Sequence, residues 1–201
     1  MSLYAKLSER AAQGKPLVVG LIGAGKFGAM YLAQVLKTPG VHLAAIADLA
    51  PANAKANLAR VGWKPERYGA ASLDAALAHG TTHVSDDWEA LVRHPRLDVV
   101  VECTGHPLAA VEHCLAAFRH GKHVVNVTVE ADALCGPLLA RRATEAGVST
   151  ASPTAISRRL SAIWSTGGAR PALASSRRGA ATSGCRILRS RRRTRCGAIT
   201  G

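Results

Sequence analysis

Aromatic residues are scarce in this chain, at 4% of its 201 residues, and its five cysteines form no C-x-x-C pair. An odd number of cysteines without such a pair argues against a disulfide framework or a zinc site, and it fits a reducing cytoplasm. We therefore expect a cytoplasmic protein with no metal site.

The sequence also lacks a long apolar stretch. No uninterrupted run approaches the roughly 20 residues that span a membrane. Residues 1–16 contain no apolar segment typical of a secretory signal. Leu3, Leu7 and Arg10 are instead spaced by about one helical turn, so residues 1–14 are predicted to form a short helix. We expect no membrane partner.

Acidic residues are missing from the last quarter of the chain. All 13 Asp and Glu residues lie in residues 1–145 together with 15 Lys and Arg, whereas residues 146–201 hold 11 Arg and no acid. The formal net charge of +13 therefore belongs almost entirely to the last part. A basic balance usually suggests a nucleic-acid partner, but here the rest of the chain is nearly neutral.

Residues 149–201 also lack a sustained helical or strand period. They consist mainly of Arg, Ser, Ala, Gly and Thr, so they cannot bury enough apolar surface to offset the entropy of ordering. We predict a basic tail of low order. The segment Arg189–Arg195 could neutralise phosphates, but only Trp164 is available for stacking on bases, so we do not expect a nucleic-acid partner.

A glycine-rich segment is the most informative feature that is present. The apolar run Val18–Ile22 precedes Gly23, Gly25 and Gly28, which have the G-x-G-x-x-G spacing, and an apolar pattern of helical period follows. In this arrangement the first glycine permits a tight turn, the second admits a pyrophosphate and the third lets the helix pack closely. The free N–H groups of the helix start would bind phosphates. The alternative is a strand, turn and helix without a ligand.

A second apolar run, Leu43–Ala47, ends in Asp48, which lies 25 positions after Gly23. This is close to the spacing of about 20 residues expected for the carboxylate that binds the adenosine ribose. The alternatives for Asp48 are a solvated loop carboxylate and a helix N-cap before Pro51. The pattern favours the ribose contact.

The residues after Asp48 bear on the choice between NAD and NADP. A carboxylate here repels the 2′-phosphate of NADP, and Leu49 occupies the position where an arginine would accept that phosphate. Lys55 and Arg60 could still reach it. On balance the sequence favours NAD over NADP.

Strand-like and helical patterns alternate as far as about residue 148. This alternation predicts βαβ units, and hence an α/β fold with a Rossmann-type doubly wound parallel sheet over residues 15–148. Right-handed crossovers would bring Gly23, Asp48, Thr104 and Asn126 together at the carboxyl ends of the strands. The expected strands lie near 17–22, 42–47, 82–84, 98–102 and 122–126, and the expected helices near 26–37, 51–61, 108–119 and 131–146, with two shorter helices within 72–94.

Five motifs occur in order along the chain: VGLIGAGKFG, AIAD, VVVECTG, GKHVVN and VEADALCGPLLARRATEAGV. Together they resemble the NAD(P)-dependent oxidoreductases related to homoserine dehydrogenase, including relatives that carry a C-terminal SAF domain. The Gfo/Idh/MocA oxidoreductases are similar but more distant. The resemblance covers residues 3–148 and implies a nicotinamide cofactor, a small-molecule substrate and self-association into homo-oligomers.

The resemblance also implies roles for individual residues. Asp48 would bind the adenosine ribose, while Thr104 and Gly105 would line the nicotinamide side with Glu102 just beneath. The alternatives are a plain strand-to-helix turn at Thr104 and Gly105, and a solvated strand-end carboxylate at Glu102. The pyrophosphate would be held by Gly23, Ala24, Gly25, Lys26, Phe27 and Gly28.

Two departures from the family pattern limit what the resemblance implies. Related dehydrogenases often have a catalytic lysine after GKHV, whereas this chain reads Asn126-Val127-Thr128-Val129-Glu130, and its last lysine is Lys122. No catalytic residue can therefore be assigned. The family also continues into a substrate domain, whereas residues 149–201 resemble GC-rich DNA read out of frame. We interpret them as following a frameshift near Val148.

The sequence therefore predicts the nucleotide-binding part of an oxidoreductase that transfers a hydride between nicotinamide and a carbonyl or hydroxyl group. We expect this form to bind the cofactor and to turn over poorly or not at all. Two alternatives stay open. One is binding of nucleic acid or another anionic partner through the arginine-rich tail, and the other is a regulator that binds NAD without chemistry.

Overall fold

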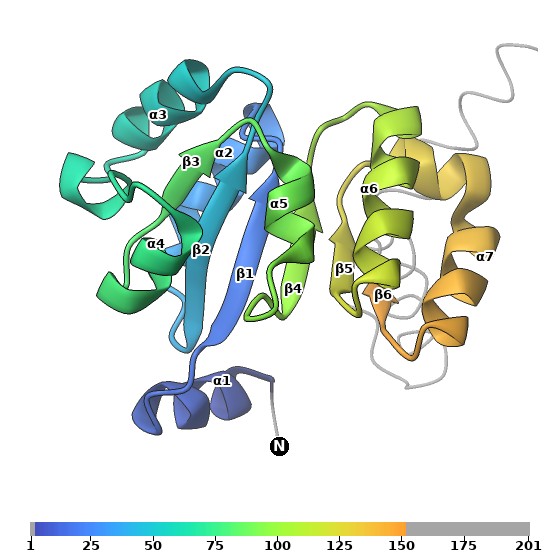
Figure 1. The fold of residues 1–201 in the computed structure, drawn as a ribbon, viewed down its shortest axis with the longest axis horizontal. Helices are drawn as coiled ribbons and strands as arrows, with labels where there is room; N and C mark the ends of the chain where they lie inside the picture. Colours follow the sequence, from blue (N-terminus) through green and yellow to red (C-terminus); the bar gives the residue numbers. More distant parts are fainter. Residues whose placement is uncertain (1–2, 152–201) are drawn as a thin grey trace, which may run out of the picture. The chain divides into compact units, whose positions relative to one another are not determined.

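Six strands form one parallel sheet in the computed structural model, which describes residues 3–151 (Figure 1). The strand order is β3-β2-β1-β4-β5-β6, so the order reverses between β1 and β4. This arrangement confirms the predicted α/β, Rossmann-type doubly wound sheet. The strands are β1 (Leu17–Ile22), β2 (Val41–Ala47), β3 (His83–Ser85), β4 (Val99–Glu102), β5 (His123–Asn126) and β6 (Thr150–Ala151).

Helices connect the strands and pack on both faces of the sheet (Figure 1). None of the helices within residues 3–151 is both long enough and apolar enough to cross a membrane. The helices are α1 (Leu3–Ala12), α2 (Lys26–Val35), α3 (Pro51–Arg60), α4 (Leu73–His79), α5 (Trp88–Arg93), α6 (Pro107–Arg119) and α7 (Val129–Glu145), with a 3₁₀ turn η1 at Pro65–Arg67.

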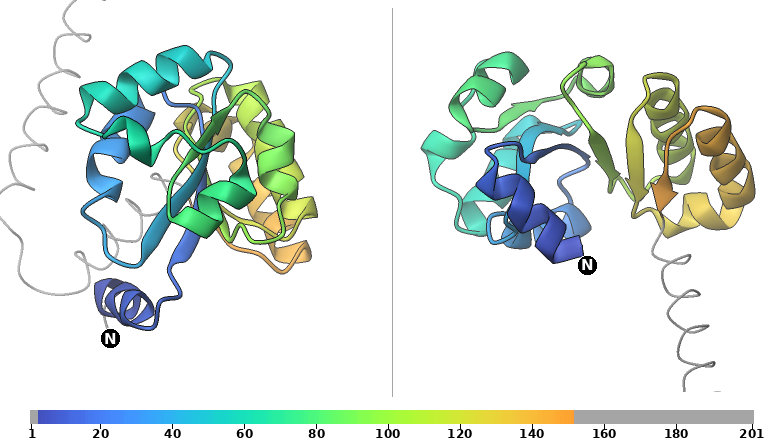
Figure 2. Two further views of the ribbon diagram at one scale, coloured as in Figure 1. Left: turned by 60° about the vertical axis from the view of Figure 1, so that its left-hand side comes forward. Right: turned by 90° about the horizontal axis from the view of Figure 1, so that it is seen from below.

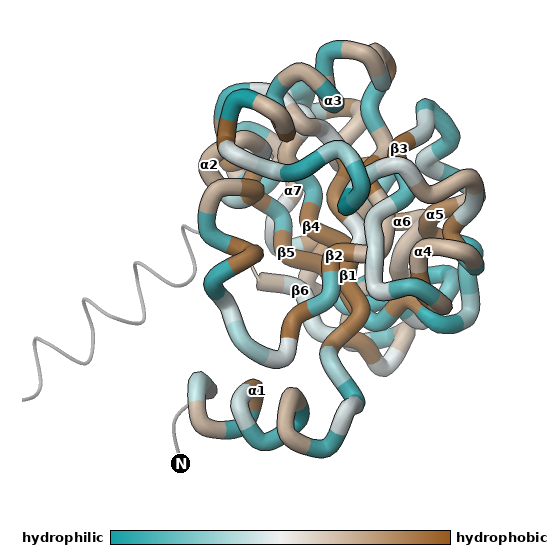
Figure 3. The backbone as a smooth tube through the Cα atoms, turned by 90° about the vertical axis from the view of Figure 1, so that its left-hand side faces the viewer, coloured by the Kyte–Doolittle hydropathy of each residue, from teal (hydrophilic) through white to brown (hydrophobic). Residues whose placement is uncertain are grey.

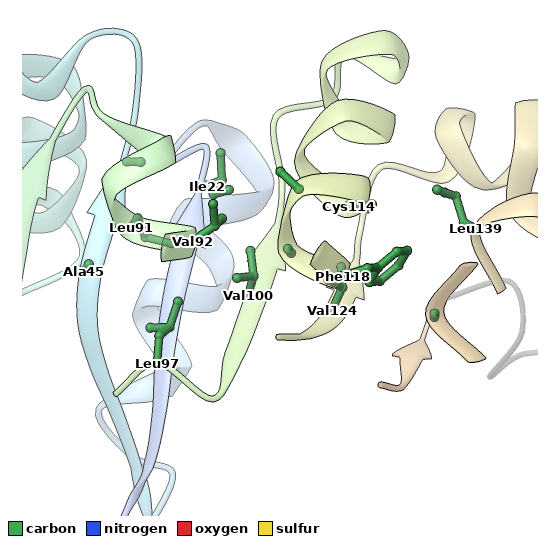
Figure 4. Packing of buried hydrophobic residues seen from close by; sticks show 14 residues of the cluster. Ile22, Ala45, Leu91, Val92, Leu97, Val100, Cys114, Phe118, Val124 and Leu139 are labelled. Carbon is green, nitrogen blue, oxygen red and sulfur yellow. The ribbon is translucent and has the colours of Figure 1, made fainter. Parts of the chain in front are cut away.

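The core consists of two apolar clusters separated by the sheet. One cluster joins side chains of the sheet to α5, α6 and α7, and it includes Ile22, Val100 and Phe118 (Figure 4). The other joins the sheet to α2 and α3, and it includes Leu21 and Leu58. Figure 3 shows the central strands as hydrophobic segments between more polar connections. A sheet with both faces covered explains why the strands are near-continuous apolar runs.

Helix α1 lies beside the amino-terminal ends of the first two strands (Figure 2). Gly40 fits tightly under it, since a Cβ at this position would lie 1.9 Å from the carbonyl oxygen of Leu7. Gly40 also has a φ of +72°, and its carbonyl accepts the N–H of Leu17 at 2.8 Å. This contact joins α1 to the starts of β1 and β2.

Two details differ from the sequence-based expectation. The last helix starts at Val129 rather than near 131, and it is kinked at Cys135, shortly before Pro137. The short strand β6 at Thr150–Ala151, which pairs with β5, had not been anticipated. The division into residues 1–14, 15–148 and 149–201 stays a prediction. The arginine-rich stretch of the tail lies outside the described residues.

Candidate cofactor site

The turn between β1 and α2 requires glycine at two positions for reasons internal to the fold. Gly23 has a φ of +89°, and a Cβ there would lie 2.8 Å from backbone atoms of Cys103 and Thr104. A Cβ at Gly28 would lie 2.4 Å from the carbonyl oxygen of Gly23. The first glycine therefore allows the turn to contact the segment after β4. The third glycine allows α2 to pack against the turn.

Gly25 differs from these two glycines, because a Cβ at this position would meet no atom of the described residues within 4 Å. Gly25 is the N-cap of α2, and within residues 3–151 the start of this helix has no side-chain cap hydrogen bond. Lys26 and Phe27 follow it, and both are exposed. The space beside Gly25 is thus open, next to N–H groups suited to an anion.

Asp48 lies one residue past β2 and holds the glycine turn. Its Oδ2 accepts the N–H of Ala24 at 2.7 Å, and its Oδ1 accepts the N–H of Ala50 at 2.9 Å. From the other side, Asn57 on α3 donates its Nδ2–H to the carbonyl of Ala24 at 2.8 Å. Asp48 does not cap α3, whose N-cap is Ala50 and lacks a side-chain cap.

Glu102, the last residue of β4, is completely buried at 0% exposure. The alternative of a solvated strand-end carboxylate is therefore wrong. Its Oε1 accepts the N–H of Thr104 at 3.0 Å and also the Thr104 hydroxyl, and its Oε2 accepts the hydroxyl of Thr128. The Oγ1 of Thr128 accepts the N–H of Gly105 at 3.1 Å. This network ties together the segments that follow β4 and β5.

The pKa of Glu102 reflects two opposing effects. Burial raises it, since a charged carboxylate loses its hydration. The close approach of His113, whose Nδ1 lies 3.6 Å from Oε1, and the hydrogen bonds from Thr104 and Thr128 lower it, and together they hold the pKa of Glu102 below its ordinary value of 4.5. The carboxylate is thus ionised at neutral pH, although it is shielded from solvent.

The register of the sheet aligns the predicted site residues at one edge. Ile22 pairs with both Ala47 and Glu102, and Glu102 pairs with Asn126. The segments that follow β1, β2, β4 and β5 therefore begin at the same level. Asn126 itself is buried at 2% exposure, and its Oδ1 has no hydrogen-bond partner within the part of the chain that the structure describes.

Sequence reasoning missed two members of this arrangement, Asn57 and Thr128. Asn57 lies on α3 among short apolar residues, and nothing in that pattern indicates a contact with the glycine turn. Thr128 lies two residues past β5, and this position after a strand end is the one sequence feature that indicates a site residue. Both are polar side chains whose partners are distant in sequence.

Lys122 cannot replace the lysine that is missing after GKHV. It lies at the amino-terminal end of β5, where its Nζ donates to the carbonyls of Leu97 at 2.8 Å and Pro95 at 3.3 Å. Burial lowers its pKa, which the nearby charge of Asp98 partly offsets. Its role is to join two loops at the edge opposite the glycine turn.

A cavity of about 590 Å³ also lies at that opposite edge. Its lining includes Lys15, His42, Trp63 and Arg67, and it contains none of the predicted cofactor residues. Within residues 3–151 there is also no cluster of His, Cys, Asp or Glu that could hold a metal ion. The candidate site is the edge around the glycine turn, where the space beside Gly25 is open.

A family model described as "Homoserine dehydrogenase, NAD binding domain" matches residues 20–153. This match confirms the resemblance drawn from the five motifs, and it confirms NAD as the expected cofactor. No curated protein matches the sequence.

Several solved structures have a similar fold. A homoserine dehydrogenase from Thiobacillus denitrificans shares 23% identity at a TM-score of 0.54, with 69% of this chain and 29% of that chain covered. The protein yvaA from Bacillus subtilis shares 20% identity at a TM-score of 0.51, with 68% and 35% covered. At these identities the likeness shows the fold alone, and this chain spans about a third of the length of these proteins.

Proposed function

Since the chain belongs to the family of homoserine dehydrogenase NAD-binding domains, we propose that it binds NAD at the carboxyl ends of β1, β2 and β4. The observation that carries this proposal is the open space at Gly25 beside the uncapped start of α2. The fold does not need a glycine there, whereas a bound pyrophosphate does.

Each predicted residue has a role in this proposal. The pyrophosphate contacts the N–H groups of the turn formed by Gly23, Ala24, Gly25, Lys26, Phe27 and Gly28. Asp48 accepts hydrogen bonds from the adenosine ribose hydroxyls. Thr104 and Gly105 line the nicotinamide side, which lies across the reversal of strand order from Asp48.

The same site favours NAD over NADP. Asp48 places a negative charge where the 2′-phosphate of NADP would lie, and Leu49 next to it is 95% exposed and offers no cation. The carboxylate and a 2′-phosphate would repel each other, since both are negatively charged. Lys55 and Arg60 on α3 are the next two cations after Asp48 in the sequence.

The reaction that we propose is hydride transfer between the nicotinamide ring and a carbonyl or hydroxyl group of a small-molecule substrate. The cofactor supplies the hydride when bound, and the protein orients it. We assign no catalytic residue within residues 3–151, because the family's lysine position is not filled. We also propose that the groups that bind the substrate lie outside the Rossmann domain, and that the protein forms homo-oligomers. A regulator that binds NAD without turnover would use the same cofactor residues.

A substitution at Gly25 tests the proposal. Gly25→Ala adds a methyl group that meets no atom of the described residues, so the free energy of unfolding should change by less than about 1 kcal/mol. The same methyl group obstructs the pyrophosphate, so the NAD dissociation constant should rise about tenfold or more. Calorimetric titration with NAD and urea unfolding measure the two quantities.

Gly69→Ala is the matched control. A Cβ at Gly69 would contact only the carbonyl oxygen of Pro65, at 3.4 Å, and the position is far from the glycine turn in sequence. This variant should keep both its stability and its NAD affinity. Unchanged NAD affinity in Gly25→Ala would contradict the proposed site.

A further inference from the structure

The buried carboxylate of Glu102 has no Lys or Arg within ion-pair distance among the residues that the structure describes. Its three hydrogen-bond donors are neutral groups of Thr104 and Thr128. Among the described residues, the one basic group within ion-pair distance is His113, whose Nδ1 lies 3.6 Å from Oε1 and makes no hydrogen bond. In a low-dielectric surrounding, the negative charge of this carboxylate acts over a longer distance than a solvated one.

The position of this charge relates it to one half of the proposed cofactor site. Dinucleotides lie across the point where the strand order reverses, which here falls between β1 and β4. Asp48 after β2 marks the adenosine half, so the nicotinamide half lies over the ends of β4 and β5. Glu102 ends β4 directly beneath Thr104 and Gly105.

The two redox states of the cofactor differ in charge at this half. The oxidised nicotinamide ring carries one positive charge, and the reduced ring is neutral after it has accepted a hydride. Adenosine, ribose and pyrophosphate are the same in both states. A negative charge below the nicotinamide side therefore distinguishes the two forms, whereas Asp48 on the adenosine side does not.

We infer that Glu102 sets the preference of this site for the oxidised over the reduced cofactor. The inference rests on the proposed function, namely that NAD binds in this crevice. Glu102 acts through its charge from beneath Thr104 and Gly105, without contacting the cofactor. It is a specificity-determining residue rather than a catalytic one.

A purely structural role for Glu102 predicts a different result. If the side chain only braces the loop after β4, its loss weakens both redox forms by the same factor. If the charge of Glu102 acts on the nicotinamide ring, loss of that charge weakens the binding of NAD⁺ more than the binding of NADH. The ratio of the two dissociation constants therefore separates the two roles.

The test compares dissociation constants of NAD⁺ and NADH for the intact chain and two variants. Glu102→Gln removes the buried charge and keeps the side chain's size. Asp98→Asn removes a carboxylate at the other end of β4, where Asp98 accepts the N–H of Val18 at 2.8 Å. We expect Glu102→Gln to weaken NAD⁺ relative to NADH by about tenfold, and Asp98→Asn to leave the ratio unchanged.

The outcomes separate this inference from the proposed function. If the intact chain binds both forms and the ratio is the same in Glu102→Gln, this inference is overturned while the NAD site stands. If the intact chain binds neither form, the proposed function fails and the inference fails with it.

A variant that does not fold still leaves a decisive measurement. Should Glu102→Gln fail to show cooperative unfolding, the intact chain alone is measured with both forms. The charge predicts that NAD⁺ binds at least as tightly as NADH. Binding of NADH about tenfold tighter than NAD⁺ would overturn the inference.

Discussion

Asp48 combines a structural contact with the proposed ribose contact. Its two oxygens accept the N–H groups of Ala24 and Ala50. Each carboxylate oxygen has a second lone pair, so the side chain can also accept hydroxyl groups without giving up either bond. The residue that we propose selects the cofactor is therefore also one that holds the glycine turn in place.

Neutralising Asp48 should shift cofactor preference. Asp48→Asn removes the charge that repels a 2′-phosphate, so the affinity for NADP should rise about tenfold relative to NAD. The NH₂ group of the asparagine then faces a backbone N–H that had donated to an oxygen of Asp48, so one hydrogen bond is lost. The free energy of unfolding should fall by about 1 kcal/mol. Parallel titrations with NAD and NADP measure the ratio, and an unchanged ratio would exclude this role of the charge.

Glu102 should also give the protein a characteristic acid sensitivity. Its pKa in the folded state lies below the ordinary 4.5, so the ionised form stabilises the fold. This contribution is fully present above about pH 4.5 and is lost as the pH falls through the folded-state pKa. Urea unfolding should show that the free energy of unfolding decreases less between pH 7 and pH 3 in Glu102→Gln than in the unchanged protein. An equal loss would contradict the lowered pKa.

At the scale of elements, the sequence predicted most of the sheet because its strands are buried on both faces. Their apolar runs, at residues 99–101 and 43–47, are continuous, which distinguishes these strands from the helices between them. Strand β6 was missed because two residues cannot show a period, and its pairing with β5 depends on backbone groups. The start of α7 was missed for a related reason, since helix ends are set by local backbone geometry.

The candidate site was predictable in part for similar reasons. Gly23, Gly25 and Gly28 have a fixed spacing with a physical cause, so the sequence alone indicated them. The burial of Glu102 was not predictable, because it depends on Thr128, which lies 26 residues further along the chain. Contacts between distant segments leave no periodic pattern in the sequence.

The loop after α3 offers a test of how elements are joined. Trp63 is 6% exposed and donates its Nε1–H to the carbonyl of Leu32 in α2 at 2.9 Å. Trp63→Phe loses this bond and some buried volume, so the free energy of unfolding should fall by about 2 kcal/mol. Tyr4→Phe, at a side chain that is 67% exposed, should change it little. Equal effects in urea unfolding would contradict the packing described for α2.

At the scale of the whole molecule, several large apolar side chains are exposed in the loops and helices that follow the strands at the carboxyl edge of the sheet. They lie in or next to the segments that follow β1, β2, β4 and β5, and α7 adds two more. Such a concentration of exposed apolar surface is typical of a face that contacts another protein surface. The residues are Phe27, Met30, Leu49, Leu108, Val129, Leu134 and Leu138.

This surface should cause self-association. Leu134 and Leu138 lie on either side of the kink in α7 and are 62% and 42% exposed. Changing both to Gln should lower the apparent mass of the chain at high concentration, measured by sedimentation, because less apolar surface is then removed from water. The NAD affinity should stay the same, since neither residue belongs to the proposed site. An unchanged mass would exclude this part of α7 from the contact.

The central claim is that the edge around Gly25 and Asp48 binds NAD, and calorimetric titration of the intact 201-residue chain with NAD tests it most directly. The account predicts saturable binding of one NAD per chain, with ADP-ribose also binding because it retains the pyrophosphate and adenosine groups. A chain that unfolds cooperatively yet shows no saturable binding of NAD at millimolar concentration would contradict it.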